Sequence, residues 1–186
     1  MKALFKWTLT VLLLSLTAGC SSMKIQDYAN ETPKLDLFAF FNGKTQAWGQ
    51  FQDRSGMVLR RFTVDITGTL SADKTQLILD EQFLYNDGEK QTRVWTIKQT
   101  QPNQFIGTAA DVVGEAKGQS AGNALNWAYV LDLPYKDSSI HVNFDDWMYL
   151  HDDQTMVNRA AVTKWGFKVG EVTLFFRKPT LENSAP

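Results

Sequence analysis

The stretch VLRRFTVDITGTL, residues 58–70, shows which fold the chain adopts. Val58, Phe62, Val64 and Ile66 alternate with polar residues, and side chains at positions i, i+2 and i+4 of a strand share one face. The same period of two runs from Lys44 towards the end of the chain, with turn residues every eight to twelve positions and no long helical pattern. The sequence therefore predicts an all-β domain.

Nine candidate strands follow from this alternation: 45–53, 57–70, 75–85, 90–100, 104–111, 123–134, 139–150, 155–165 and 168–178. Turn residues separate them, as in Asp53-Arg54-Ser55-Gly56, Asn86-Asp87-Gly88, Gln101-Pro102-Asn103 and Lys136-Asp137-Ser138. Consecutive antiparallel pairing leads either to a sandwich or to a closed barrel, and closure removes the two edges of an open meander. We favour an up-and-down barrel of about eight to ten strands.

A short helix is expected before the first strand. Leu35, Phe38 and Phe41 recur at helical spacing, and Asn42-Gly43 is typical of a helix end. This helix could plug one end of the barrel. The sequence thus predicts one barrel domain over residues 35–180, followed by a flexible tail at 181–186.

The amino terminus has the pattern of an export signal. Lys2 and Lys6 precede an apolar run, 7–18, that is too short to span a bilayer, which needs about 20 residues. Leu16-Thr17-Ala18-Gly19-Cys20 resembles a lipobox, although its leucine lies one place early. We predict a signal peptide over 1–19 and lipid attachment at Cys20. The alternative is an ordinary secretory signal followed by a free thiol, but Cys20 is the only cysteine of the chain and a lone thiol is a liability in an oxidising compartment.

The residues after Cys20 indicate where the chain is held. Ser21 stands where aspartate would resemble an inner-membrane retention signal, so we expect the periplasmic face of the outer membrane. Residues 20–34 are polar and contain Pro33, which predicts an acylated tether of at most about 45 Å. Removal of Lys2 and Lys6 with the signal peptide leaves 17 of the 19 basic side chains against 20 acidic ones. No basic patch for nucleic acid is evident, and the expected membrane contact is the lipid alone. The oligomeric state stays open.

Several sequence blocks carry a family resemblance. They are Ala47-Trp48-Gly49, Gln52-Asp53-Arg54-Ser55-Gly56, Arg60-Arg61-Phe62, Arg93-Val94-Trp95, Gly107-Thr108-Ala109, Asp111-Val112-Val113-Gly114, Gly122-Asn123-Ala124, Phe144-Asp145-Asp146-Trp147-Met148-Tyr149-Leu150, Asn158-Arg159-Ala160 and Val169-Gly170-Glu171-Val172-Thr173-Leu174. With them the chain resembles uncharacterised proteobacterial lipoproteins that carry a domain of unknown function, related in shape to the lipocalin-like calycins. The resemblance implies a barrel fold and an envelope location, and it implies no activity.

Strand alternation predicts which side chains face the barrel interior. Four charges fall in register with inward aromatic residues: Arg60, Glu81, Arg93 and Asp145. We expect a lumen that binds an amphipathic or hydrophobic ligand, with these charges orienting its polar head and Trp95, Trp127, Tyr129, Trp147 and Tyr149 forming its walls. Two alternatives stay open. The charges could be structural ion pairs across the barrel, or the barrel could be a filled scaffold for interactions in the envelope.

Enzyme and metal motifs are weak. Gly118-Gln119-Ser120-Ala121-Gly122 matches G-x-S-x-G, but a strand follows it where a nucleophile elbow needs a helix, so we expect a hairpin connection. Asp145 and Asp146 are neighbours on a strand and point to opposite faces, which favours solvent for Asp146. His141 and His151 match no zinc spacing. We therefore predict no catalytic residue, no metal and no cofactor.

Overall fold

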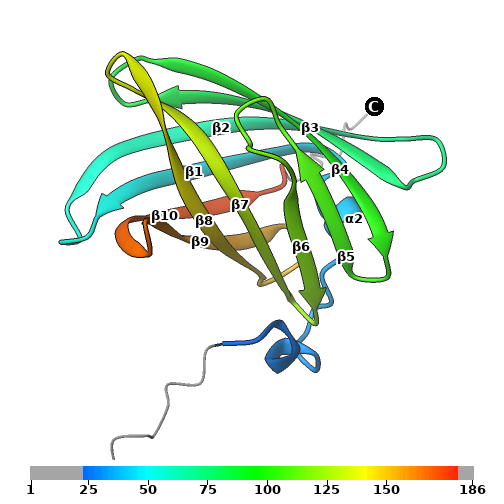
Figure 1. Cartoon of the computed structure of the whole chain (residues 1–186). Helices are drawn as coiled ribbons and strands as arrows, with labels where there is room; N and C mark the ends of the chain where they lie inside the picture. The colour runs from blue at the N-terminus through cyan, green and yellow to red at the C-terminus, as the bar shows by residue number, and fades with distance from the viewer. Residues whose placement is uncertain (1–22, 180–186) are drawn as a thin grey trace, which may run out of the picture.

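The computed structural model describes residues 23–179, and they form a closed antiparallel β-barrel (Figure 1). Each strand pairs with its neighbours in sequence, and β1 pairs with β10 to close the barrel. The strands are β1 (Gly43–Asp53), β2 (Val58–Leu70), β3 (Gln76–Tyr85), β4 (Lys90–Gln101), β5 (Gln104–Thr108), β6 (Ala116–Ala121), β7 (Ala124–Tyr135), β8 (Ser138–Leu150), β9 (Thr155–Lys164) and β10 (Phe167–Arg177). The predicted up-and-down barrel is confirmed.

The turns form where the sequence predicted them. Asp53 holds the β1–β2 turn, because its Oδ1 accepts hydrogen bonds from the backbone N–H groups of Ser55 and Met57 at 2.8 and 3.1 Å. Gly56 adopts a φ of +90°, which a residue without Cβ reaches at little cost. Asn103 and Lys136 also have positive φ in their turns. These tight connections fix the antiparallel register between consecutive strands.

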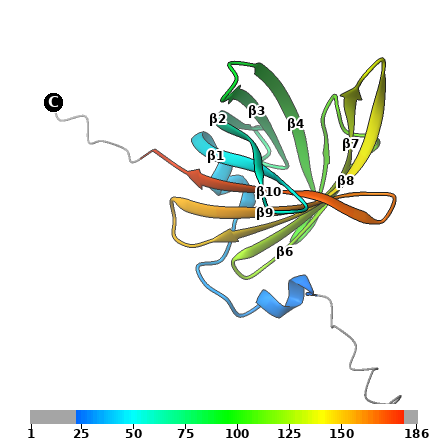
Figure 2. The same cartoon turned by 90° about the vertical axis from the view of Figure 1, so that its left-hand side faces the viewer.

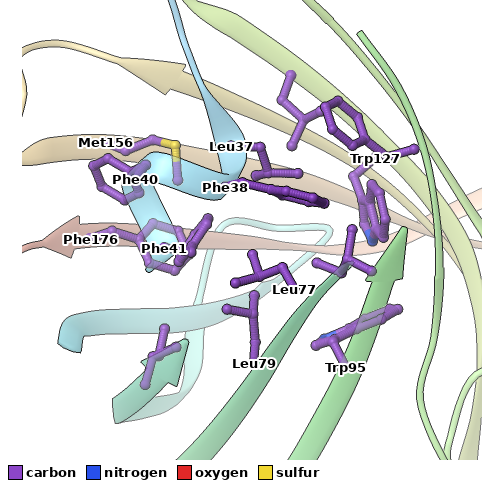
Figure 3. Packing of buried hydrophobic residues seen from close by; sticks show 14 of the residues in the cluster. Leu37, Phe38, Phe40, Phe41, Leu77, Leu79, Trp95, Trp127, Met156 and Phe176 are labelled. Atoms are coloured by element: carbon purple, nitrogen blue, oxygen red, sulfur yellow. The ribbon is translucent and has the colours of Figure 1, made fainter. Parts of the chain in front are cut away.

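The short helix α2 (Leu37–Phe41) closes one end of the barrel. Asp36 caps the helix by accepting a 3.0 Å hydrogen bond from the Ala39 N–H. After the helix the chain turns into β1 at Gly43, which has a φ of +87°. Four of its five side chains are buried. Figure 3 shows them among Leu77, Leu79, Trp95, Trp127, Met156 and Phe176. The predicted plug helix is therefore present, and the dense part of the core lies beneath it.

One strand was missed in the sequence. β6 lies within the stretch interpreted as a hairpin connection, and Gly118 and Ser120 belong to it. Its inward positions are the small residues Ala116, Gly118 and Ser120, so the strand shows no apolar alternation. Gly118 has no room for a side chain because the indole of Trp127 lies against it: a Cβ built on Gly118 would approach Trp127 Cε3 to 2.3 Å.

The expected tether does not stand free over the residues described. The 3-10 helix η2 (Ile25–Tyr28) packs on the outside of the barrel near β6 and β7 (Figures 1 and 2). Ile25 is buried, and the Leu35 N–H donates to the Gly122 carbonyl at 2.8 Å. The extended 45 Å spacer is thus wrong from Ile25 onward. The predicted signal peptide, Cys20 and the tail at 181–186 lie outside the described residues.

Candidate functional site

The barrel encloses a cavity of about 630 Å³. Leu37 and Phe41 of α2 form its floor, and the exposed residues Glu89, Gln91 and Val169 belong to its wall at the opposite end of the strands. The lumen therefore reaches solvent at the end away from α2, which we call the mouth. Cavities that hold small ligands commonly measure about 300–1,000 Å³.

Aromatic side chains form one wall of the lumen. Trp95 lies edge-on to Trp127 and to Tyr129, with ring centroids 5.8 and 5.4 Å apart, and Tyr129 stacks on Phe144 at 5.1 Å. The sequence predicted Trp95, Trp127 and Tyr129 to face inward, and all three line the cavity. Such rings offer a rigid apolar surface with large contact area.

A charged cluster lies on the lumen wall beside these rings. Arg93 holds Asp111 by a two-pronged interaction, with its Nη2 at 2.7 Å and its Nε at 3.0 Å from Asp111 Oδ2. Glu81 lies 3.9 Å from Arg93 on the neighbouring strand. Burial raises the pKa of Glu81 to about 7, and the positive charge of Arg93 opposes that rise. Carboxylates on both sides raise the pKa of the Arg93 guanidinium further above its usual value against the opposing effect of burial.

Asp146 is the second buried carboxyl of the lumen. It is 6% exposed, and the Tyr129 hydroxyl donates to its Oδ2 at 3.2 Å. Its Oδ1 is buried and has no hydrogen-bond partner within residues 23–179. Burial, opposed by the Tyr129 hydrogen bond, raises the pKa of Asp146 to about 7. The sequence placed Asp146 in solvent, and that prediction is wrong.

Arg60 lies at the mouth, as its position in β2 requires. Its guanidinium stacks over the Tyr85 ring, 3.6 Å from the centroid, and bonds to Asp87 at 2.9 Å and to Glu89. Both carboxylates belong to the β3–β4 turn region. The charge of Arg60 is therefore balanced by these two carboxylates at the mouth, and its guanidinium, stacked on Tyr85, lies beside the opening.

Three predicted lumen residues point the other way. Asp145, Trp147 and Tyr149 lie on the outer face of β8, whereas the intervening Asp146 and Met148 line the cavity. The outward rings are half-buried because Tyr28 of η2 packs on them, with centroids 6.0 Å from Trp147 and 5.3 Å from Tyr149. An aromatic pair covered from outside gives the same alternation as a pair facing the core, so the sequence assigned the wrong face of β8.

The barrel wall is thin between β4 and β7 near the mouth. The pairing of β4 with β5 ends at Thr96 and Thr108, and that of β6 with β7 ends at Lys117 and Ala128. The remaining halves of β4 and β7 diverge in Figure 2. A side depression of about 380 Å³ lies there, lined among others by Phe83, Gln91, Leu133 and Pro134. The Arg93–Asp111 ion pair spans this gap, because Arg93 belongs to β4 and the Asp111 carbonyl accepts a hydrogen bond from Asp132 of β7.

The remaining motifs gain no chemistry from the fold. Ser120 is buried within a strand, and its hydroxyl lies 3.4 Å from Asn103 Oδ1. His141 lies 3.4 Å from Asp132 on the outside of the barrel. Within residues 23–179 there is no group of three or more His, Cys, Asp or Glu side chains that could hold a metal. In the same range no helix is long and apolar enough to cross a membrane.

Fold and site together define a closed antiparallel up-and-down barrel with an open lumen. The profile of a family described as "Protein of unknown function (DUF3833)" matches residues 14–178, and the chain belongs to this family. A search of curated proteins found no match.

Solved structures of similar fold come from distant proteins. One is a Nostoc punctiforme protein of unknown function from the DUF3598 family, with 12% identity, a TM-score of 0.59 and 80% of this chain covered. The match spans 51% of that protein, about half its length. Another is the S-type phycobiliprotein lyase CPES of Guillardia theta, with 7% identity, a TM-score of 0.54, and 77% of this chain and 91% of that one covered. At these identities the likeness shows the fold alone.

Proposed function

We propose that this protein binds a small amphipathic or hydrophobic ligand in the lumen of its barrel. The observation that carries the proposal is the open cavity of about 630 Å³, which has an aromatic wall and buried ionisable groups. A barrel that served only as a filled scaffold would occupy this volume with its own side chains, as small barrels commonly do. Here the core residues fill the end beneath α2 and leave the rest of the lumen open.

The wall chemistry supports a ligand with an apolar body and one polar group. Apolar side chains from most strands surround the cavity, and its largely buried ionisable groups include Glu81, Arg93 and Asp146. Ligand sites of this kind combine a large apolar surface with a few polar groups that set orientation. The protein of similar fold from Guillardia theta is a phycobiliprotein lyase, and we carry over from it the shape of the barrel and not that activity.

We further propose that the chain is a lipoprotein anchored by Cys20 at the periplasmic face of the outer membrane. The support is the lipobox-like sequence at 16–20 and Ser21. Met23 lies at the plugged end, where its sulfur accepts a 2.9 Å hydrogen bond from Tyr28. Two residues lie between Cys20 and Met23, so the Cα atoms of Cys20 and Met23 are at most about 10 Å apart. The plug would thus face the membrane and the mouth would face the periplasm, so the ligand would enter from the periplasm.

Ligand binding is tested by calorimetric titration of the domain with a fatty acid, a lysophospholipid and a long-chain alcohol. Val172 lines the lumen and Thr173, its neighbour, lies on the outer face. We expect one saturable site, lost in Val172→Trp and kept in Thr173→Trp. Absence of binding by the wild type, or equal binding by the two variants, would overturn the proposal. Circular dichroism confirms that both variants fold.

The anchor is tested by fractionation of cells that express the full chain. Replacement of Cys20 by Ser should abolish acyl labelling and release a folded domain into the periplasm. Continued labelling and membrane association of Cys20→Ser would contradict this assignment while leaving ligand binding untouched.

A further inference from the structure

The lumen offers hydrogen-bond acceptors to a ligand, whereas its two arginines are already paired with carboxylates. Arg60 is bonded to Asp87 and Glu89, and Arg93 is bonded to Asp111 with Glu81 beside it. Each arginine thus faces two carboxylates. A fatty-acid carboxylate would have to displace one of these partners before it could pair with an arginine. At Arg93, whose side chain is largely buried, removal of a partner from the ion pair is costly.

The carboxyl of Asp146, unlike the two arginines, lacks a charged partner among the described residues. It forms no ion pair within residues 23–179, its Oδ1 lacks a hydrogen-bond partner, and its only side-chain donor is the Tyr129 hydroxyl. An unsatisfied buried acceptor destabilises the fold, and a ligand that donates a hydrogen bond to it removes this penalty. The polar group that best complements Asp146 is therefore a donor, and a cationic donor forms the stronger bond.

The surroundings of Asp146 also suit a positive charge. The ring of Tyr129 lies edge-on to Trp95 and stacks on Phe144. Aromatic rings attract cations over their faces. Glu81 contributes a second carboxyl to the same lumen. Among the residues of the wall and their ion-pair partners, two arginines stand against Glu81, Asp87, Glu89, Asp111 and Asp146. This excess of acidic groups favours cationic over anionic ligands.

We propose that the lumen selects amphiphiles whose head is a protonated amine, and that Asp146 receives this head while the aromatic wall packs on the chain. This inference rests on the proposed function and narrows its ligand class. Glu81 lines the same lumen, so its carboxyl adds to the attraction of a cationic head. An amphiphile of the same chain length with an anionic head would bring no hydrogen-bond donor to the Asp146 carboxyl.

The test compares decylamine, decanol and decanoate by calorimetry at pH 8, each below its aggregation concentration. We expect decylamine to bind at least tenfold more tightly than decanoate, with decanol between them. Asp146→Asn should remove most of the advantage of decylamine over decanol. Asp145→Asn is the matched control, since Asp145 is the exposed neighbour on the outer face, and it should leave the order unchanged.

The outcomes separate the two proposals. Equal binding of amine and carboxylate, or tighter binding of decanoate, would overturn the amine preference and leave the lumen site standing. An amine preference that survives in Asp146→Asn would overturn the role of Asp146. If none of the three probes binds, both this inference and the proposed function fail.

Discussion

The hydroxyl of Tyr129 on β7 donates to Asp146 Oδ2 on β8 at 3.2 Å, inside the lumen. The register places Trp127 opposite Asp146, so Tyr129 reaches it diagonally across the sheet. The bond satisfies one carboxyl oxygen and leaves the other without a partner. The barrel thus maintains a carboxyl in a place where a charge is expensive, which is typical of groups kept for binding and not for stability.

Asp146 should make the fold less stable as the pH rises. Burial raises the pKa of this carboxyl from 3.8 to about 7, so the folded state holds the proton more tightly than the unfolded state does. Its contribution is greatest below about pH 4, falls between about pH 4 and pH 7, and stays low above. We expect Asp146→Asn to raise the free energy of unfolding by about 1–3 kcal/mol at pH 8 and by little at pH 4. Urea unfolding at both pH values checks this.

The control for this prediction is Asp145→Asn. Asp145 is exposed and accepts a 2.7 Å hydrogen bond from Asn126, so its replacement should change the free energy by less than about 0.5 kcal/mol at either pH. A stabilisation by Asp146→Asn that is equal at both pH values would contradict the raised pKa.

Amine binding should weaken on acidification. Asp146 and Glu81 both have pKa values raised to about 7 by burial, and protonation removes the charge that attracts the amine. The other groups near them are Arg93, Asp111, Tyr129 and, on the outer face, Asp145. Arg93 stays charged in this range. We expect the Kd of decylamine to rise at least fivefold between pH 8 and pH 6, while that of decanol stays constant; equal pH profiles would speak against the carboxyls as the amine site.

Gly118 should be intolerant of a side chain. A Cβ at this position would lie 2.3 Å from Cε3 and 2.4 Å from Cζ3 of Trp127, and a buried indole has little room to move. We expect Gly118→Ala to lower the free energy of unfolding by about 1–3 kcal/mol and to alter the near-ultraviolet dichroism of the tryptophans. Gln119→Ala, on the exposed face of the same strand, is the control. Equal stability of the two variants would show that Trp127 is not held against β6.

Tyr28 should hold η2 on the barrel. Its ring contacts Trp147 and Tyr149, and the two tyrosine hydroxyl oxygens are 3.4 Å apart. We predict that Tyr28→Ala makes residues 23–34 sensitive to limited proteolysis and shifts tryptophan emission to longer wavelength. Gln26→Ala, an exposed change in the same helix, should do neither. If both variants resist the protease equally, the packing of η2 does not depend on this ring.

The sequence predicted the barrel well because the rule behind it is local. Alternation in β2, β3, β4 and β7 and the turn at Asp53–Gly56 follow from strand geometry, and Arg60, Glu81, Arg93, Trp95, Trp127 and Tyr129 line the lumen as predicted. β6 was missed because its inward residues are small, and the contact that requires glycine at position 118, the indole of Trp127, leaves no sequence signal on β6 itself. The face of β8 was misread because Trp147 and Tyr149 are covered by η2, which a strand pattern does not reveal. Asp146 and Asp111 therefore entered the site only with the structure.

The most direct test of the lumen site uses the indole N–H signals of the tryptophans in a nuclear magnetic resonance titration with decanol, a neutral probe. Trp95 and Trp127 line the lumen, whereas Trp48, Trp147 and Trp165 lie on the outside of the barrel. We predict saturable shifts of the Trp95 and Trp127 signals with one common Kd, and none for the other three. Shifts confined to Trp48, Trp147 or Trp165, or unchanged signals from Trp95 and Trp127 at saturating probe, would contradict a ligand site inside the barrel.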